Sequence, residues 1–438
     1  MKIVFLGAGS TIFARNVLGD VMLTPSLQNS DIILYDIDAL RLEESKIILD
    51  AINNTMNQGR ANIKTYCGEG HLQEVFIDAT FVINAIQVGG YDPSTIIDFE
   101  IPKKYGLKQT IADTVGIGGI MRGLRTIPEL EKFAKVMERA CPDAYFLNYT
   151  NPMAILTGYM QRYTKVKTIG LCHSVQVCTR DLFKELGMEE YLEGRKEFIA
   201  GINHMAWLLK IEDKNGKDLY PMIKERAKKK NETEKHNDMV RFEYINSFGH
   251  YCTESSEHNA EYNQYFIKNK YPELIDKYNI PLDEYIRRCI KQIEDWKSTK
   301  EEIIKDSHKE HVRTEEYASY IMDAIATNKT YQIGASVINT GLITNLPPEA
   351  CVEVPCLVNG NGIHPTYVGA LPFQLAGLNC GNIYSQLMCI DAAVTKDREK
   401  IYQSVLLDPH ASSELSIDDI KSMVDELIEA HGDYMSMY

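Results

Sequence analysis

Apolar runs of strand length alternate with helical periodicity over residues 1–170. Helical stretches such as Arg41–Met56 and Ile127–Arg139 lie between the apolar runs. Because strands that alternate with helices form parallel sheets covered on both faces, the pattern predicts an α/β fold with a parallel sheet. The expected strands are Lys2–Leu6, Asp31–Tyr35, Phe81–Ile86, Tyr145–Leu147 and Thr168–Leu171.

The pattern changes after about Cys178, where helical periodicity dominates. The Lys-rich stretch Lys224–Lys235 is predicted to be a solvated helix end or loop. No repeat or low-complexity linker separates the two regions, so we expect the second to pack tightly on the first. The helices expected here are Arg180–Leu186, Asp283–Ile304 and Leu415–His431, and the expected strand-like runs are Phe198–Ile211 and Val337–Ile343.

Composition and charge exclude several classes of protein. The 438 residues are 44% hydrophobic, which is ordinary for a globular protein. A formal net charge of -14 argues against nucleic acids and anionic membranes as partners. No apolar run is long enough to span a bilayer, and the N-terminal apolar run stops at Gly7, which indicates a strand rather than a signal peptide. The ten cysteines show no CxxC spacing, so we expect reduced thiols in a cytoplasmic protein.

A glycine turn follows the first expected strand. Gly7 permits a tight turn, and Gly9 allows the backbone to approach a pyrophosphate. Ser10 and Thr11 lead into a helix-compatible segment, whose free N–H groups would face that anion. Ile12 stands where the dinucleotide fingerprint has its third glycine, so the motif is incomplete.

An acid at the end of the second expected strand strengthens this interpretation. Asp36 would accept hydrogen bonds from an adenosine ribose and repel a 2′-phosphate, which favours NAD over NADP. The alternative is a tight strand–helix turn with an aspartate on the surface. We predict NAD binding at Gly7, Gly9, Ser10, Thr11 and Asp36.

A cysteine and a histidine in strand-rich stretches are candidate metal ligands. Thiolate and imidazole suit transition metals, and Cys172 with His204 would leave coordination positions for water or substrate. Ligand chemistry alone suggests zinc first. The alternative, favoured by the pattern alone, is a buried thiol and a hydrogen-bonded core histidine. His173, beside Cys172, is a candidate general acid, although a lone histidine is more often structural.

Three further polar segments could border a substrate crevice. Asn148 and Asn151 follow a strand, where they could bond sugar hydroxyls or hold their own loop. The glycine-rich run Asp113–Arg122 could line the crevice or be a flexible loop. The run Glu254–Tyr262 is dense in ionisable groups, and Tyr262 could act as a base if a metal lowered its pKa. Spacing alone favours an exposed helix start for this run.

Taken together, the motifs resemble glycoside hydrolase family 4 nearly from end to end, and its melibiase-type α-galactosidase branch most of all. Several of the motifs are specific, and their order along the chain adds weight. The segments that carry the resemblance are GAGST at the N-terminus, Ile86–Tyr91, ADTVGIGGIMRGLRTIP, LNYTNPMA, GLCHSV, GINHMAW, TESSEHNAEY and Val352–Cys356.

The resemblance implies two domains. Residues 1–175 would form a Rossmann domain with tightly bound NAD. Residues 176–438 would form an α/β domain similar to the second domain of lactate and malate dehydrogenases, for metal, substrate and oligomerisation. A divalent metal, usually manganese (Mn²⁺), would be held by Cys172 and His204 in place of zinc. We expect a homodimer or homotetramer.

The resemblance also implies roles for single residues. Asn151 matches a substrate-contacting asparagine, and Tyr262 matches the tyrosine proposed as proton acceptor. Phospho-sugar members often carry an aspartate acid directly after the metal-binding cysteine. Here that position is His173, so the acid is His173 or, in reserve, Asp113.

The implied reaction is hydrolysis of α-galactosides of the melibiose type. It proceeds by oxidation at C3, removal of the C2 proton, elimination at C1, addition of water and re-reduction, with NAD regenerated in every cycle. An α-glucosidase or α-galacturonidase of the same family is the alternative. Outside the family, a 2-hydroxyacid dehydrogenase would need an arginine clamp, for which Arg122 and Arg125 are candidates. A non-catalytic NAD-sensing protein would bind the cofactor without turnover.

Overall fold

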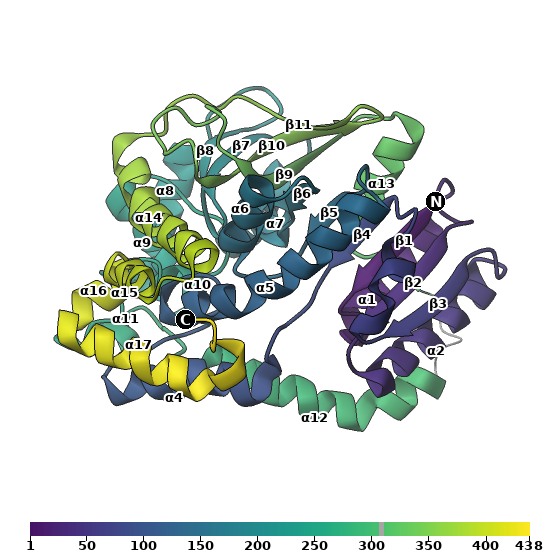
Figure 1. The fold of residues 1–438 in the computed structure, drawn as a ribbon. Helices are drawn as coiled ribbons and strands as arrows, with labels where there is room; N and C mark the ends of the chain where they lie inside the picture. The colour runs from purple at the N-terminus through teal and green to yellow at the C-terminus, as the bar shows by residue number, and fades with distance from the viewer. Residues whose placement is uncertain (306–310) are drawn as a thin grey trace.

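One mixed sheet runs through the molecule, with helices on both faces (Figure 1). The computed structural model describes residues 1–305 and 311–438, with side chains up to residue 296 and again from residue 311. The strands are β1 (Lys2–Leu6), β2 (Asp31–Asp36), β3 (Asn62–Cys67), β4 (Phe81–Asn84), β5 (Tyr145–Asn148), β6 (Lys167–Gly170), β7 (Lys196–Ile202), β8 (Met205–Glu212), β9 (Tyr331–Ile338), β10 (Cys351–Asn359) and β11 (Gly362–Pro365).

The helices connect these strands and close the chain at its C-terminal end. They are α1 (Thr11–Leu23), α2 (Ala39–Met56), α3 (Leu72–Phe76), α4 (Ile96–Lys104), α5 (Gly116–Ala140), α6 (Met153–Tyr163), α7 (His173–Leu186), α8 (Tyr220–Thr233), α9 (Met239–Phe248), α10 (Ser256–Ala260), α11 (Glu273–Lys277), α12 (Glu284–Lys305), α13 (Ala318–Thr327), α14 (Phe373–Thr395), α15 (Arg398–Leu406), α16 (Pro409–Glu414) and α17 (Ile417–His431). Short helical turns are η1 (Glu69–His71), η2 (Gly90–Thr95), η3 (Glu189–Tyr191) and η4 (Gly432–Tyr434).

The part of the sheet built from the first 170 residues is parallel. Its strands lie in the order β3, β2, β1, β4, β5 and β6. This is the order of a doubly wound dinucleotide-binding sheet, which reverses between β1 and β4. Such sheets bind ligands in the crevice at the carboxyl ends of their strands. The predicted Rossmann sheet is therefore confirmed.

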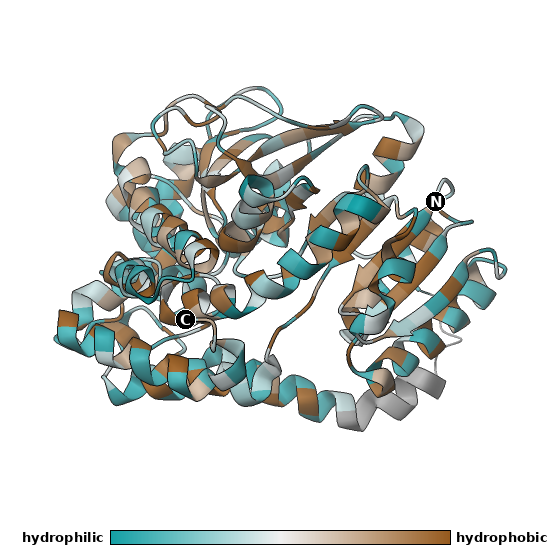
Figure 2. Ribbon diagram, viewed as in Figure 1, coloured by the Kyte–Doolittle hydropathy of each residue, from teal (hydrophilic) through white to brown (hydrophobic). Residues whose placement is uncertain are grey.

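Strand β1 is apolar from Ile3 to Leu6 because both of its faces are buried there. Ile3 and Phe5 pack in one core with residues of α1 and α2. Val4 and Leu6 pack in the other core with residues of α3 and α5. Figure 2 shows the hydrophobic strands inside and hydrophilic outer faces on the surrounding helices. A continuous apolar run thus supplies side chains to two cores in turn.

The antiparallel strands continue the same sheet without a break. Gly170 of β6 pairs antiparallel with Ser336 of β9, and β10, β7 and β8 follow in that order. Helices α14, α15 and α17 then pack against α4, α5 and α6. The C-terminal helices therefore cover helices that belong to the N-terminal half of the chain. The division into domains of residues 1–175 and 176–438 stays a prediction.

Most predicted elements are present, some with different bounds. The expected strand-like run Phe198–Ile211 is a hairpin of β7 and β8 that turns at residues 203 and 204. Helix α5 begins at Gly116 rather than at Ile127, and α7 begins at His173 rather than at Arg180. The glycine-rich segment before Ile127 is therefore mostly helix. Strand β9 spans Tyr331–Ile338, so only Val337 and Ile338 of the expected run Val337–Ile343 are strand.

Other features agree with the composition. All ten cysteines are unpaired, as expected of reduced thiols. Among the described residues, no helix is both long and apolar enough to cross a bilayer.

A buried charge cluster ties α4, α5 and the C-terminal helix together. Arg125 of α5 donates to both carboxylate oxygens of Asp98 on α4, at 3.2 Å and 2.7 Å. Nε2 of His431, the last residue of α17, lies 2.8 Å from Asp98 Oδ1. The side chains of Arg125 and His431 are 0% exposed and that of Asp98 is 4% exposed, so water cannot replace the carboxylate.

Removing this carboxylate charge should destabilise the fold strongly. Asp98→Asn leaves the guanidinium of Arg125 buried without its countercharge, which costs on the order of 3–5 kcal/mol. The measurement is the free energy of unfolding in urea. Asp143→Asn is the control, because it breaks the exposed pair with Lys167 and should change stability little. An equal loss in the free energy of unfolding of the two variants would contradict the stabilising role of the buried Asp98 carboxylate.

Candidate active site

The glycine turn and Asp36 lie together at the carboxyl end of β1. Gly7 has a φ of 81°, and a Cβ there would lie 2.6 Å from the carbonyl oxygen of Ala85, so the turn requires glycine. The N–H of Gly9 donates to Asp36 Oδ2 at 2.6 Å. The structure therefore brings together Gly7, Gly9 and Asp36, as a dinucleotide site requires.

Ser10 and Thr11 begin α1 and hold the turn through their side chains. Ser10 Oγ donates to the carbonyl oxygen of Gly7 at 2.7 Å, and Thr11 Oγ1 lies 3.0 Å from Ser45 Oγ. The Ser10 side chain makes no capping hydrogen bond to the first turn of α1. The backbone N–H groups of that turn therefore stay available to an anion.

One row of paired residues crosses the sheet and aligns the strand ends from which two loops start. Gly170 of β6 pairs with Ser336 of β9, Ser336 pairs with Glu353 of β10, and Glu353 pairs with Gly201 of β7. A Cβ on Gly170 would lie 2.8 Å from Ser336 Cβ, so glycine permits the close approach of the two strands. The chain therefore leaves the sheet at the same level after Gly170 and after Gly201, with β9 and β10 between the two strands.

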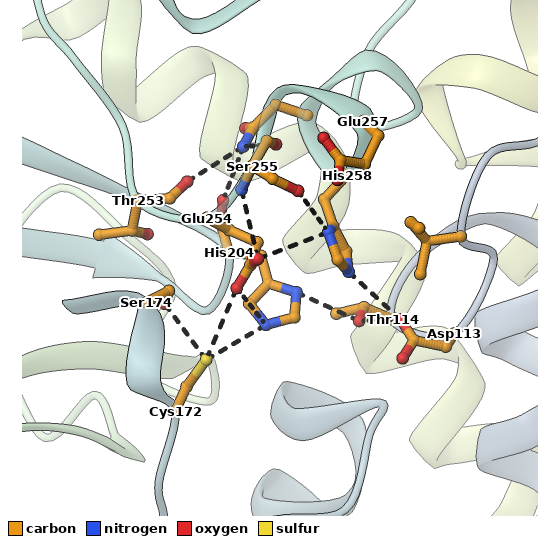
Figure 3. Close-up of polar contacts among 12 residues, drawn as sticks. Asp113, Thr114, Cys172, Ser174, His204, Thr253, Glu254, Ser255, Glu257 and His258 are labelled. Atoms are coloured by element: carbon orange, nitrogen blue, oxygen red, sulfur yellow. Dashed lines mark hydrogen bonds and ion pairs between the residues drawn. The ribbon is translucent and has the colours of Figure 1, made fainter. Parts of the chain in front are cut away.

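Three side chains that could hold a metal ion meet beyond this row (Figure 3). Cys172 Sγ lies 3.3 Å from His204 Nε2, and Glu254 Oε2 lies 3.4 Å from the same nitrogen and 3.9 Å from the sulfur. Thiolate, imidazole and carboxylate are ligands of divalent transition metals. The structure thus brings the predicted Cys172 and His204 together and adds Glu254 as a third donor.

The backbone and the neighbours of His204 fix its ring. His204 and Glu254 both have a φ of 64°, a strained conformation that is commonest at functional sites. His204 Nδ1 lies 3.2 Å from Thr114 Oγ1, which leaves Nε2 to face Cys172. Burial and the charges of Glu254 and Glu353 raise the pKa of the Cys172 thiol. A cation beside the sulfur would favour the thiolate, because metal ligands must be deprotonated.

Asp113 links this cluster to Asn151. Asp113 Oδ2 accepts a hydrogen bond from Asn151 Nδ2 at 3.0 Å, and Oδ1 lies 3.7 Å from His258 Nε2. His258 Nδ1 lies in turn 3.6 Å from Glu254 Oε1. Figure 3 shows His258 between Asp113 and Glu254. The polar groups of five separate segments therefore form one continuous cluster.

Opposite charges in this cluster keep one another ionised. Burial alone would raise the pKa of Asp113, but His258, Arg122 and His204 outweigh it and hold the pKa far below its usual range. Burial alone would lower the pKa of His258, but Glu254 and Asp113 outweigh it and raise the pKa. Asp113 is thus a carboxylate that can accept hydrogen bonds or a proton, which disfavours its predicted reserve role as an acid.

His173 lies at the edge of the cluster and is 41% exposed. Its Nε2 lies 2.6 Å from Glu316 Oε2, and its ring packs against those of Tyr149 and Tyr317. Burial alone would lower the pKa of His173, but the bond to Glu316 and nearby carboxylate charges outweigh it and raise the pKa. An imidazolium held in this way suits the predicted role of general acid.

Tyr262 is fully buried behind the metal-ligand cluster. Its hydroxyl donates to the carbonyl oxygen of Asn203, the residue before His204, at 3.3 Å. Burial and the charges of Asp113 and Glu254 raise its pKa well above the usual value. Without a bound cation, Tyr262 therefore keeps its proton.

Asn148 lies in a buried network rather than on an open surface. It is 1% exposed, and its Oδ1 accepts a hydrogen bond from Asn84 Nδ2 at 2.9 Å. Its own amide donates to the carbonyl oxygen of Thr150 and to Thr157 Oγ1, each at 3.1 Å. This placement favours the role of holding the loop over that of binding sugar.

Three residues of the cluster were not singled out by sequence reasoning. Glu254 and His258 lie in the ionisable-rich run expected to be a helix start. The run contains the short helix α10 with Ser255 as its N-cap, but the expected exposure is wrong, because Ser256, His258 and Asn259 are buried. Glu316 carried no sequence signal. Arg125, offered as a substrate clamp for a dehydrogenase, is bound to Asp98 and is not free for that role.

Comparison with known proteins gives the following similarities, among others. The chain is 59% identical over 437 residues to an α-galactosidase of Bacillus subtilis, covering 100% of this chain and 99% of the relative. It is 29% identical to an α-galacturonidase of Thermoanaerobacter italicus, covering 99% of this chain and 97% of the relative. A 6-phospho-α-glucosidase from gut microorganisms, solved with NAD and Mn²⁺, has the same fold, with a TM-score of 0.80, 21% identity and coverage of 99% and 98%.

Two family models match nearly the whole chain. The model described as "Family 4 glycosyl hydrolase" matches residues 2–188, and the model of the "Family 4 glycosyl hydrolase C-terminal domain" matches residues 199–411. The resemblance on which the sequence predictions were based is therefore confirmed, and the chain belongs to glycosyl hydrolase family 4.

Proposed function

We propose that the protein hydrolyses α-galactosides with the help of NAD and a divalent metal, for which Mn²⁺ is the first candidate. The observation that carries the proposal is the cluster of Cys172, His204 and Glu254 beside Asp113 and Asn151. The high identity to an α-galactosidase over the full chain supports the choice of substrate. The structure solved with NAD and Mn²⁺ supports the choice of cofactors.

The glycine turn fits a dinucleotide. A Cβ at Gly7 would clash with Ala85 and one at Gly9 with Asp36, so both positions of the turn require glycine, as in pyrophosphate-binding turns. Asp36 lies within hydrogen-bonding reach of the turn and suits a ribose with two free hydroxyls. Ile37, next to it, is 80% exposed and offers apolar surface for an adenine ring.

The three-donor cluster fits a divalent metal that also binds substrate. Three protein ligands leave coordination positions open, as in catalytic metal sites. When bound, NAD would supply hydride uptake and return at sugar C3, and Mn²⁺ would supply polarisation of the oxygen atoms at C2 and C3. The side chains of this chain supply positioning and proton transfer.

Asn151 and Asp113 are proposed to hold the sugar. Asn151 Nδ2 already donates to Asp113, so the remaining lone pairs of both groups can accept sugar hydroxyls. His258 keeps Asp113 ionised from the other side. A sugar bound here would lie next to the metal-ligand cluster.

Two further groups are proposed to move protons. His173 holds one proton at Nε2 against Glu316, so the proton at Nδ1 is available to the leaving oxygen. Tyr262 is proposed to accept the C2 proton. Its pKa is raised in part by Asp113, Glu254 and Cys172, so positive charge at the metal-ligand cluster would lower it again. We also propose that the protein works in the cytoplasm as a homodimer or homotetramer.

The substrate class can be tested with nitrophenyl α-galactoside, α-glucoside and α-galacturonide. Each is assayed with and without NAD, Mn²⁺ and a reductant. We expect turnover of the α-galactoside alone, only with both cofactors, and no net accumulation of NADH. Faster turnover of the uronide would assign the chain to the galacturonidases. Net NADH production from a 2-hydroxy acid would instead indicate a dehydrogenase.

The metal site can be tested with Cys172→Ser. Losing a direct ligand should weaken Mn²⁺ binding by more than the about 10–100-fold that outer contacts cost, and activity should fall with it. Binding is measured by electron paramagnetic resonance without substrate. Cys380→Ser is the matched control, because Cys380 is also a half-buried free thiol. Full activity of Cys172→Ser without bound metal would rule out the ligand role.

Proton removal at C2 can be tested in heavy water. If a side chain removes the C2 proton and solvent supplies its replacement, the galactose product should carry deuterium at C2. Nuclear magnetic resonance of the product measures the label. A product with protium at C2 after full turnover is incompatible with elimination.

A further inference from the structure

The loop of residues 110–115, called here the Asp113 loop, carries two groups of the cluster. Asp113 accepts a hydrogen bond from Asn151, and Thr114 Oγ1 lies 3.2 Å from Nδ1 of the ligand His204. The loop has no strand or helix of its own and leads directly into α5. Its position therefore has to be set by contacts from elsewhere in the chain.

One buried carboxylate binds three successive N–H groups of this loop. Glu261 Oε2 accepts from Thr110 N at 2.9 Å, and Oε1 accepts from Ile111 N at 3.2 Å and from Ala112 N at 2.7 Å. Glu261 is 4% exposed, so water cannot take its place. Ala112 has a φ of 52°, the left-handed conformation that turns successive N–H groups toward one acceptor.

The opposite side of the loop is packed against the first turn of α5. A Cβ on Gly118 would lie 2.4 Å from the carbonyl oxygen of Ala112, and one on Gly119 would lie 2.7 Å from the carbonyl carbon of Thr114. The loop is thus held between the helix and the carboxylate. The helix side offers close packing, and the carboxylate binds the N–H groups of residues 110–112. Two further hydrogen bonds hold Thr110: its Oγ1 donates to the carbonyl oxygen of Glu257 at 2.6 Å, and its carbonyl oxygen accepts from Tyr285 N at 3.1 Å.

We propose that Glu261 is a positioning residue that sets the Asp113 loop and, through Thr114 and Asp113, orients His204 and Asn151. The inference rests on the proposed function, because it assumes that His204 binds a metal. Glu261 itself touches neither ligand nor substrate in this arrangement. Its effect on the orientation of His204 therefore passes through Thr114, which makes this coupling measurable.

The test is a double-mutant cycle on Mn²⁺ affinity, measured by electron paramagnetic resonance in the full chain without substrate. Thr114→Val removes the hydroxyl beside His204 with little change of shape, and we expect about 10-fold weaker binding. Glu261→Gln places an amide N–H against the loop donors, and we expect a similar loss. The double variant should bind no more weakly than Thr114→Val alone, because both changes remove the same contact.

Glu414→Gln is the matched control. Glu414 also accepts a backbone N–H, that of Asn269 at 2.8 Å, and its side chain is 6% exposed, but its loop carries no group of the cluster. Mn²⁺ affinity should be unchanged in this variant. If Glu261→Gln does not fold, Glu261→Asp keeps the charge but withdraws the carboxylate from the loop, and it enters the same cycle.

Two results would overturn the proposal. If the fold-loss of Mn²⁺ affinity in the double variant equals the product of the two single losses, Glu261 acts independently of Thr114. Unchanged Mn²⁺ affinity in a folded Glu261→Gln would show that the loop needs no such anchor. If the wild-type chain binds no Mn²⁺ at all, the proposed function is wrong, and this inference fails with it.

Discussion

The site depends on the paired row that runs from Gly170 through Ser336 and Glu353 to Gly201. This row joins the parallel part of the sheet to its antiparallel part. It fixes where the chain leaves the sheet after Gly170 and after Gly201. A slip of one residue would turn every side chain of a strand to the opposite face. The absence of a side chain on Gly170 is what lets the strands approach at that register. The metal-ligand cluster is therefore a consequence of strand pairing, and its side chains add chemistry to a geometry already set.

The same row buries the carboxyl group of Glu353, which no positively charged side chain of the row balances. Burial and the charge of Glu254 raise the pKa of Glu353 to about 7, and Glu353 Oε2 has no hydrogen-bond partner among the described side chains. The charge of Glu353 in turn helps to raise the pKa of the Cys172 thiol. An unpaired buried charge is costly, and a divalent cation would offset several of these groups at once. The excess of acids thus prepares the site for a cation.

The sequence predicted those parts of the fold that follow from local pattern. Strand β1 could be found because burial on both faces requires a continuous apolar run, and the glycine turn could be found because a tight turn needs Gly7. Helix α5 was placed too late because its glycines are typical of a loop. Gly118 is in fact required by the close approach of the helix to the backbone of Ala112. Residues whose role arises only from tertiary contact, such as Glu316, left no local signal.

Helices α14, α15 and α17 also determine when the molecule can finish folding. They cover α4, α5 and α6, so the first part of the chain keeps an exposed apolar surface until the last residues have been synthesised. Contacts between the two ends of a long chain form slowly, because the intervening loop must be closed first. On the ribosome, this surface of the nucleotide-binding part therefore stays uncovered until the C-terminal helices have emerged. A truncated chain would expose the same surface to aggregation or to chaperones.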